Sequence, residues 1–204
     1  MRKIILLRHA ESIANIGELI LDKSIIKLTD EGKQSAESFS FSAPSPDRII
    51  VSKYTRTIET AEPLYKRFKN VDVSLWYDLN EFDYIDPTNL LNLNLEERNN
   101  VENEYWLNSN PFIKNHNNRE NFKEFVDRVF GVIKKIKKIE IGTNIIITHG
   151  LVIKLILLIL NRYTNLNAIK KDDSFYIEIM KEFVKDNNID NIQNLQEIDI
   201  TNLI

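Results

Sequence analysis

Short apolar runs that end abruptly in polar residues constrain this fold more than any other feature. Residues 3–7 read Lys-Ile-Ile-Leu-Leu and lead into Arg8 and His9, and residues 144–148 lead into His149. Apolar runs of this length, without polar alternation, are typical of strands that are buried on both faces. The sequence therefore predicts a sheet that is covered by other elements on each side.

Further strands and helices alternate along the chain. Thr29, followed by Asp30 and Glu31, is a typical helix N-cap with acids in the first turn, where the helix dipole favours them. This order predicts an α/β protein, a three-layer α/β/α sandwich with a mostly parallel sheet. Further strands are predicted at residues 49–51, at 71–75 and near 175–180, and further helices at residues 53–68, 122–136 and 151–160. Pro63 should kink or restart the first of these helices, and Gly142 should end the second.

Residues 83–118 interrupt this pattern. They are rich in Asn and contain Pro87 and Pro111. We expect them to form a cap with a short helix at residues 95–107, inserted in a single domain that spans residues 1–204. The tail from residue 185 is weakly patterned, but its last apolar residues could pack on an edge of the sheet.

Composition excludes several kinds of chemistry. The chain has no cysteine, which removes disulfides, thiol nucleophiles and Cys-ligated metals, and its three histidines lack metal-ligand spacing. The net charge of −3 argues against a nucleic-acid partner. The most apolar stretch, residues 151–160, is too short to span a bilayer. We expect a soluble, cytoplasmic protein with no membrane partner, no metal and no cofactor, and make no prediction of oligomeric state.

The polar residues at the strand ends could act together. In open α/β sheets the ligand lies beyond the carboxyl ends of the strands, where His9 and His149 are predicted, and Arg56 follows another such end. The guanidiniums of Arg8 and Arg56 suit a phosphoryl group, because each offers a planar fork of donors. A neutral histidine can attack phosphorus, a second histidine held protonated would add positive charge, and a carboxylic acid must protonate the leaving group. These residues suggest phosphoryl transfer through a phosphohistidine.

Ordered motifs between residue 4 and about residue 160 strengthen this interpretation. Together they resemble the histidine phosphatase superfamily, the phosphoglycerate-mutase-like proteins. The matching segments are Arg8-His9-Ala10-Glu11-Ser12 with Asn15, Leu28-Thr29-Asp30-Glu31-Gly32 with Ala36, Ser52 to Ala61 around Arg56, Leu79-Asn80-Glu81, a helix that carries Glu120, Glu124, Arg128 and Val129, and Thr148-His149-Gly150.

The resemblance implies a role for each matching residue. His9 would be the nucleophile. Glu81 would be the general acid and then the base for water. The phosphoryl group of a small phosphorylated substrate would be bound by Arg8, Asn15, Arg56, His149 and the backbone N–H of Gly150. His116 has no matching motif, and we expect it to be exposed.

Several departures from the family pattern leave alternatives open. Ala10 stands where Gly is usual, and Ser35 where Gln is common. The segment after Glu81 lacks the usual glycine, so Asp83 or Asp86 could be the acid instead. The long segment of glycolytic mutases is absent, which favours a phosphatase over a mutase. A phosphatase for phosphohistidine proteins and a non-catalytic binder of phosphorylated ligands are further alternatives.

Overall fold

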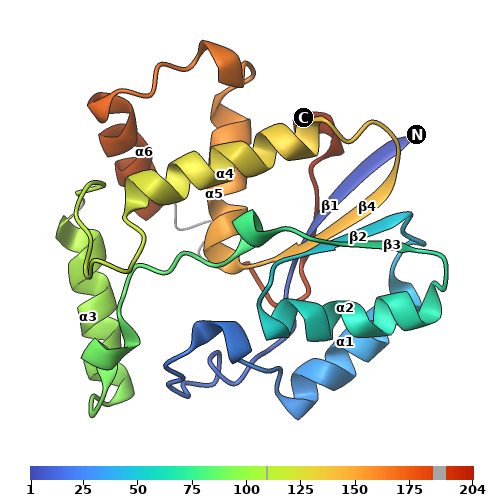
Figure 1. The fold of residues 1–204 in the computed structure, drawn as a ribbon, viewed down its shortest axis with the longest axis horizontal. Coiled ribbons are helices and arrows are strands. Elements are labelled where there is room, and N and C mark those ends of the chain that lie inside the picture. Colours follow the sequence, from blue (N-terminus) through green and yellow to red (C-terminus); the bar gives the residue numbers. More distant parts are fainter. Residues whose placement is uncertain (109, 186–191) are drawn as a thin grey trace.

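The computed structural model describes residues 1–108, 110–185 and 192–204. Its centre is a five-stranded sheet in the order β3-β2-β4-β1-β5 (Figure 1). All neighbouring strands are parallel except β5, which runs antiparallel to β1. The mostly parallel sheet of an α/β fold is therefore confirmed. The strands are β1 (Arg2–Arg8), β2 (Arg48–Val51), β3 (Asp72–Leu75), β4 (Gly142–Thr148) and β5 (Glu197–Asp199).

Helices cover both faces of the sheet, as the apolar runs require. Ile4 and Leu6 of β1 face one core and the alternate residues Ile5 and Leu7 face the other, as the period of a strand dictates. The first core contains α4 (Phe122–Lys137), α5 (Gly150–Arg162) and α6 (Asp173–Lys185). The second contains α1 (Asp30–Ser42) and α2 (Thr55–Arg67) (Figure 1).

The predicted helix signals explain the helix ends. The side chain of Thr29 accepts a hydrogen bond from the N–H of Gly32 at 2.9 Å and so caps α1. Asn121 and Glu124 form a reciprocal capping box at the start of α4. The short 3₁₀ helices are η1 (Lys23–Ile25), η2 (Tyr77–Leu79), η3 (Pro87–Leu90), η4 (Leu166–Ala168) and η5 (Thr201–Leu203).

Two expectations about individual elements were wrong, and a third was wrong in part. Residues 175–180 are part of α6 and not a strand, because the buried set extends to Phe183 at helical spacing. Gly142 does not end a helix: α4 ends at Lys137, and Gly142, with φ of 84°, begins β4. Of the kink or restart expected at Pro63, the restart does not occur, since α2 is continuous through this residue.

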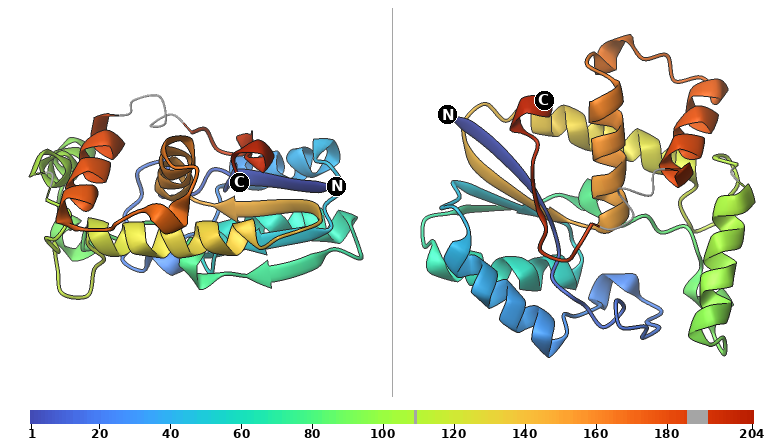
Figure 2. Two further views of the ribbon diagram at one scale, coloured as in Figure 1. Left: turned by 90° about the horizontal axis from the view of Figure 1, so that it is seen from above. Right: turned by 180° about the vertical axis from the view of Figure 1, so that it is seen from behind.

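The segment 83–118 contains η3 and α3 (Leu95–Asn108), which agrees with the predicted short helix. No described residue of α3 is fully buried, and the helix lies apart from the sheet, away from the two chain ends (Figure 2). Tyr105 and Trp106 of α3 pack on Phe82, which stacks on Phe125 of α4 with ring centroids 4.4 Å apart. This aromatic cluster joins the segment to the core.

The tail does pack on the sheet edge. Residues 197–199 pair with residues 5–7 of β1, and Ile200 is buried. Residues 186–191 of the weakly patterned tail lie outside the described part of the chain. Among the helices described, none combines the length and apolar character needed to cross a membrane.

Candidate active site

The register of the central strands brings the two strand-end histidines together. Arg8 is paired with Thr148 across β1 and β4, and the backbone N–H of His9 donates to the carbonyl of Thr148 at 3.0 Å. The rings of His9 and His149 consequently lie edge to face, with centroids 5.2 Å apart. Both side chains are buried. The sequence predicted this meeting because parallel strands end at a common edge.

Hydrogen bonds fix the tautomer of His9. Its Nδ1 lies 2.7 Å from the carbonyl oxygen of Ala10, an acceptor, so Nδ1 carries the proton. Arg56 Nε donates to His9 Nε2 at 3.1 Å, which requires a lone pair on Nε2. Burial, with the charges of Arg56 and Arg8, lowers the pKa of His9 well below its ordinary 6.5. These observations favour a neutral imidazole near pH 7, whose Nε2 lone pair accepts a hydrogen bond from the Arg56 guanidinium.

Arg56 lies at the start of α2, as its motif predicts. Its Nη1 donates to the carbonyl of Lys23 at 2.9 Å, and its guanidinium lies over the ring of Tyr54 at 4.8 Å. Burial lowers the pKa of Arg56, while the nearby Glu81 carboxyl raises it. The contacts of Tyr54 and Lys23 were not predicted, because neither residue differs in type from an ordinary surface residue of a helix start or loop.

Only one of the two ring nitrogens of His149 has a hydrogen-bond partner among the described residues. Its Nε2 lies 2.9 Å from the hydroxyl of Ser52, and its buried Nδ1 has no hydrogen-bond partner among the described residues. Burial, followed by the charge of Arg56, lowers its pKa well below 6.5. This direction favours a neutral ring in the site without ligand, and the protonated second histidine expected from the sequence stays a prediction for the site with a phosphoryl group bound.

Arg8 supplies a second open donor beside the start of α5. Its buried Nε has no partner in the described part of the chain. A Cβ built on Gly150 would lie 3.6 Å from that Nε, so the guanidinium lies against the N-terminus of α5. The open Nε of Arg8, the open Nδ1 of His149 and the first N–H groups of α5 form a place for an anion next to His9.

The C-terminal tail orients this group of residues, which sequence reasoning missed. Arg8 Nη1 donates to the carbonyl of Ile192, and the N–H of Leu195 donates to the carbonyl of Arg8 at 3.0 Å. Asn194 Nδ2 donates to the carbonyl of His9 at 2.8 Å. These contacts use backbone atoms or a common Asn, so no residue pattern signals them.

Hydrogen bonds within the loop after β1 hold its shape. Asn15 Oδ1 accepts hydrogen bonds from the N–H and the hydroxyl of Ser12, both at 2.9 Å. Asn15 also lines the cavity described below. The N-terminus of α1 supports the same loop from behind. A Cβ at Gly32 would lie 2.0 Å from the carbonyl oxygen of Glu11, so this approach requires glycine.

Glu81 follows η2 and is held by an anchored loop. Arg128 Nη1 donates to the carbonyls of Asp78 and Asn80 at 2.7 and 2.8 Å, and Arg128 also forms a bidentate ion pair with Glu120. The Thr148 hydroxyl donates to the carbonyl of Leu79 at 2.7 Å. The loop is therefore tied both to α4 and to the end of β4.

Burial of the Glu81 carboxyl raises its pKa above the ordinary 4.5, although the N–H of Phe82 and the charges of Arg56 and Arg8 act in the opposite direction. The two alternative acids have other partners. Asp83 pairs with Lys23 at 2.7 Å and with Arg119. The pKa of Asp86 is lowered by hydrogen bonds from Thr88. Glu81 is the carboxyl group whose environment suits a proton donor.

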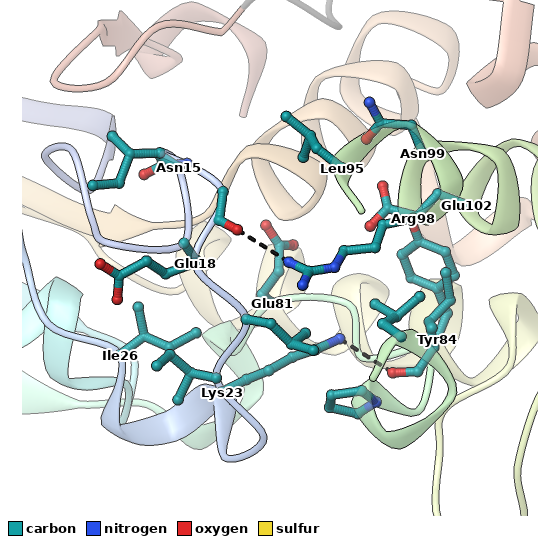
Figure 3. A pocket seen from close by; sticks show the side chains of 18 of the residues that line it. Asn15, Glu18, Lys23, Ile26, Glu81, Tyr84, Leu95, Arg98, Asn99 and Glu102 are labelled. Carbon is teal, nitrogen blue, oxygen red and sulfur yellow. Dashed lines mark hydrogen bonds between the residues drawn. The ribbon is translucent and has the colours of Figure 1, made fainter. Parts of the chain in front are cut away.

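A cavity of about 650 Å³ extends from Arg56 and Glu81 (Figure 3). It is lined by the loop after β1, by η1 and by residues of the segment 83–118, including Tyr84, Arg98 and Glu102. Cavities of this size accommodate small organic ligands. His116 is exposed and lies 3.6 Å from Asp86, outside this cavity. Within residues 1–108, 110–185 and 192–204, no cluster of His, Cys, Asp or Glu could hold a metal ion.

Several solved structures share this fold. A phosphoserine phosphatase from Entamoeba histolytica aligns with a TM-score of 0.65 and 17% identity, over 98% of this chain and 90% of its own. A proposed alpha-ribazole-5'-P phosphatase from Escherichia coli aligns with a TM-score of 0.62 and 25% identity, over 78% of each chain. A mycobacterial glucosyl-3-phosphoglycerate phosphatase aligns with a TM-score of 0.62 and 16% identity, over 79% of this chain and 80% of its own.

Among curated proteins, no relative matches this chain. The family model of the histidine phosphatase superfamily (branch 1), in contrast, matches residues 4–171. That range contains both strand-end histidines, Arg8, Arg56 and Glu81, and it covers the sheet edge on which they meet. The chain therefore belongs to branch 1 of the histidine phosphatase superfamily.

Proposed function

We propose that this protein hydrolyses a phosphomonoester in two steps through a phosphohistidine on His9. The observation that carries the proposal is the set of open donors next to the lone pair of His9 Nε2. Arg8 Nε and His149 Nδ1 are both buried and lack partners in the described structure. Buried donors are rarely left unpaired in folded proteins, and the oxygens of a phosphoryl group would pair with them.

In the first step, His9 Nε2 attacks phosphorus and the bond from phosphorus to the leaving oxygen breaks. Arg8, Arg56 and the N-terminus of α5 stabilise the charge that develops on the phosphoryl oxygens. Asn15, whose Oδ1 is occupied by Ser12, directs its amide N–H groups to the same oxygens. Burial raises the pKa of Glu81, which favours a proton on this carboxyl group, and Glu81 transfers that proton to the leaving alkoxide.

In the second step, the Glu81 carboxylate removes a proton from water as the water oxygen attacks phosphorus. The bond between phosphorus and Nε2 breaks, its electron pair returns to nitrogen, and inorganic phosphate leaves. The Ser52 hydroxyl lies 2.9 Å from His149 Nε2, and in this mechanism it donates a hydrogen bond there, so that the ring proton stays on Nδ1, toward the phosphoryl group. The segment 83–118 forms the cap of this site and contacts the rest of the substrate.

A panel of phosphomonoesters, assayed with the wild-type protein and with His9→Ala, tests the proposal. We expect the wild type to release phosphate from an aryl phosphate, and to yield an acid-labile phosphoprotein when quenched during turnover. His9→Ala should show neither. Full activity of His9→Ala would refute the mechanism. Isomerisation of 3-phosphoglycerate before phosphate release, followed by NMR, would indicate a mutase instead.

A further inference from the structure

Arg98 extends from the first turn of α3 into the cavity next to Glu81 (Figure 3). Two backbone carbonyls fix its side chain. Its Nε donates to the carbonyl of Leu93 at 3.0 Å, and its Nη1 donates to the carbonyl of Gly17 at 3.1 Å. The guanidinium is therefore held in place between α3 and the loop that follows the nucleophile.

The start of α3 is itself fixed. The Asn94 side chain accepts a hydrogen bond from the N–H of Glu97 at 3.0 Å, and the Glu97 carboxylate accepts one from the N–H of Asn94 at 2.7 Å. This reciprocal pair is a capping box, which sets the direction in which the first helical turn begins. Arg98 is thus positioned before any ligand enters the cavity.

The charge of Arg98 is not balanced by a neighbour. Among the described residues, no carboxylate lies within 4.0 Å of its nitrogens, whereas Lys23 in the same cavity is paired with Asp83 at 2.7 Å. The carboxyl groups of Glu18, Glu81 and Glu102 also line the cavity, but none of them forms an ion pair with Arg98. The two hydrogen bonds that fix this half-buried guanidinium use Nε and Nη1 and leave the N–H groups of Nη2 available to an anion.

We infer that Arg98 binds a carboxylate on the substrate, so that the substrate is a small organic acid that carries a phosphomonoester. The inference rests on the proposed function. The charged N–H groups of Arg98 Nη2 suit a carboxylate, and the cavity is large enough for a group beyond the phosphate. A singly charged carboxylate fits better than a second phosphate dianion, because Glu18 and Glu102 would repel the larger charge.

Binding to His9→Ala separates this inference from catalysis. By calorimetry we compare 3-phosphoglycerate with glycerol 1-phosphate, which has a neutral hydroxymethyl group in place of the carboxylate. We expect at least about a 10-fold tighter Kd for 3-phosphoglycerate, the size of one charge-assisted hydrogen bond. Adding Arg98→Gln should reduce this preference to about 2-fold and change glycerol 1-phosphate binding less than about 3-fold, while Arg98→Lys should restore part of it.

Arg162→Gln, on the far surface where Arg162 pairs with Glu178, is the matched control and should leave the preference intact. Equal affinity for the two ligands, or an equal loss of both with Arg98→Gln, would overturn the inference and leave Arg98 as a tie to Gly17. Tighter binding of propane-1,3-diol bisphosphate than of 3-phosphoglycerate would overturn the choice of a carboxylate. Turnover by the wild type is measured separately, so a protein that binds selectively but hydrolyses nothing would refute the proposed function alone.

Discussion

The carboxyl edge of the sheet and the segment 83–118 contribute side chains to the same cavity, but they hold them in different ways. At the sheet edge, backbone pairing between β1 and β4 sets the positions of His9 and His149, and both are buried. In the segment 83–118, α3 has no fully buried residue and is held by an aromatic contact and by side-chain bonds to nearby backbone.

This difference indicates a division of tasks. Residues whose positions depend on strand register are suited to the reaction, since a shift of about 1 Å can cost about 100-fold in rate. Residues on a helix outside the sandwich can change without disturbing the core, which suits recognition of one substrate among many. The predictions below test whether the effects of substitutions separate in this way.

Substitution of Arg56 should have the largest effect. We expect Arg56→Gln to lower kcat/KM by about 10³-fold for every phosphomonoester, because Arg56 contacts His9 Nε2 and would stabilise the phosphoryl group. Steady-state assays with aryl and alkyl phosphates measure this. Arg48→Gln, which removes an exposed ion pair with Asp72 at the sheet margin, is the control and should leave activity unchanged. A loss of kcat/KM for one substrate alone would indicate that Arg56 recognises that substrate and does not stabilise the phosphoryl group.

The loss of kcat caused by substitution of Glu81 should depend on the basicity of the leaving group. Glu81→Gln should lower kcat for an alkyl phosphate by about 10²-fold or more, because a basic alkoxide needs a proton. An aryl phosphate, whose leaving group is a weaker base, should lose much less. The test compares kcat across a series of phosphates with graded leaving-group pKa. Asp83→Asn should not reproduce this dependence, and if it does, Asp83 is the acid.

The pH dependence of kcat/KM should be bell-shaped. The reaction needs a neutral His9 and a protonated Glu81. Activity should fall about tenfold per pH unit below the pKa of His9, which lies well below 6.5, and above the pKa of Glu81, which lies above 4.5. The substrate phosphate also titrates, with a pKa of about 6, and the pH profile of kcat/KM must be corrected for this titration. In Glu81→Gln the alkaline fall should disappear; its persistence would contradict the assignment.

Arg128 should act through Glu81 as a positioning residue. Arg128→Met releases the carbonyls of Asp78 and Asn80 and should lower kcat for an alkyl phosphate by about 10-fold, with little change in KM. In a Glu81→Gln background the same substitution should have almost no effect on kcat, because the group it positions is gone. Equal losses of kcat in both backgrounds would show that Arg128 has a general structural role. Arg128→Lys, which keeps the positive charge, would help to separate that role from the positioning of Glu81.

The helix caps should show the smallest effects. Asn94→Ala removes the cap of α3 and should lower the free energy of unfolding by about 1 kcal/mol, without changing turnover of an aryl phosphate. The matched variant Asn121→Ala removes the same type of cap from α4, where Asn121 is buried, and should cost about 2 kcal/mol. Chemical denaturation measures both. An equal cost would indicate that α3 is as tightly coupled to the core as α4.

Much of the fold follows from local sequence. The apolar runs predicted the strands that contain His9 and His149, and Thr29 predicted the start of α1. The error at residues 175–180 arose because a short, mostly apolar run fits either a strand or a helix, and the helical period is resolved only when Phe183 is included. The roles of the site residues stay predictions until they are tested.

The sequence by itself determined the class of fold and the family, and it supplied the candidate residues for the proposed reaction, because each depends on patterns within a few consecutive residues. Tertiary structure alone decided which nitrogen of His9 accepts a hydrogen bond from Arg56, that burial lowers the pKa of His149, and that Asp83 is paired with Lys23. It also decided that Ile192 and Arg128 orient Arg8 and the loop before Glu81. These properties depend on burial and on contacts between residues far apart in the chain, which no local pattern encodes.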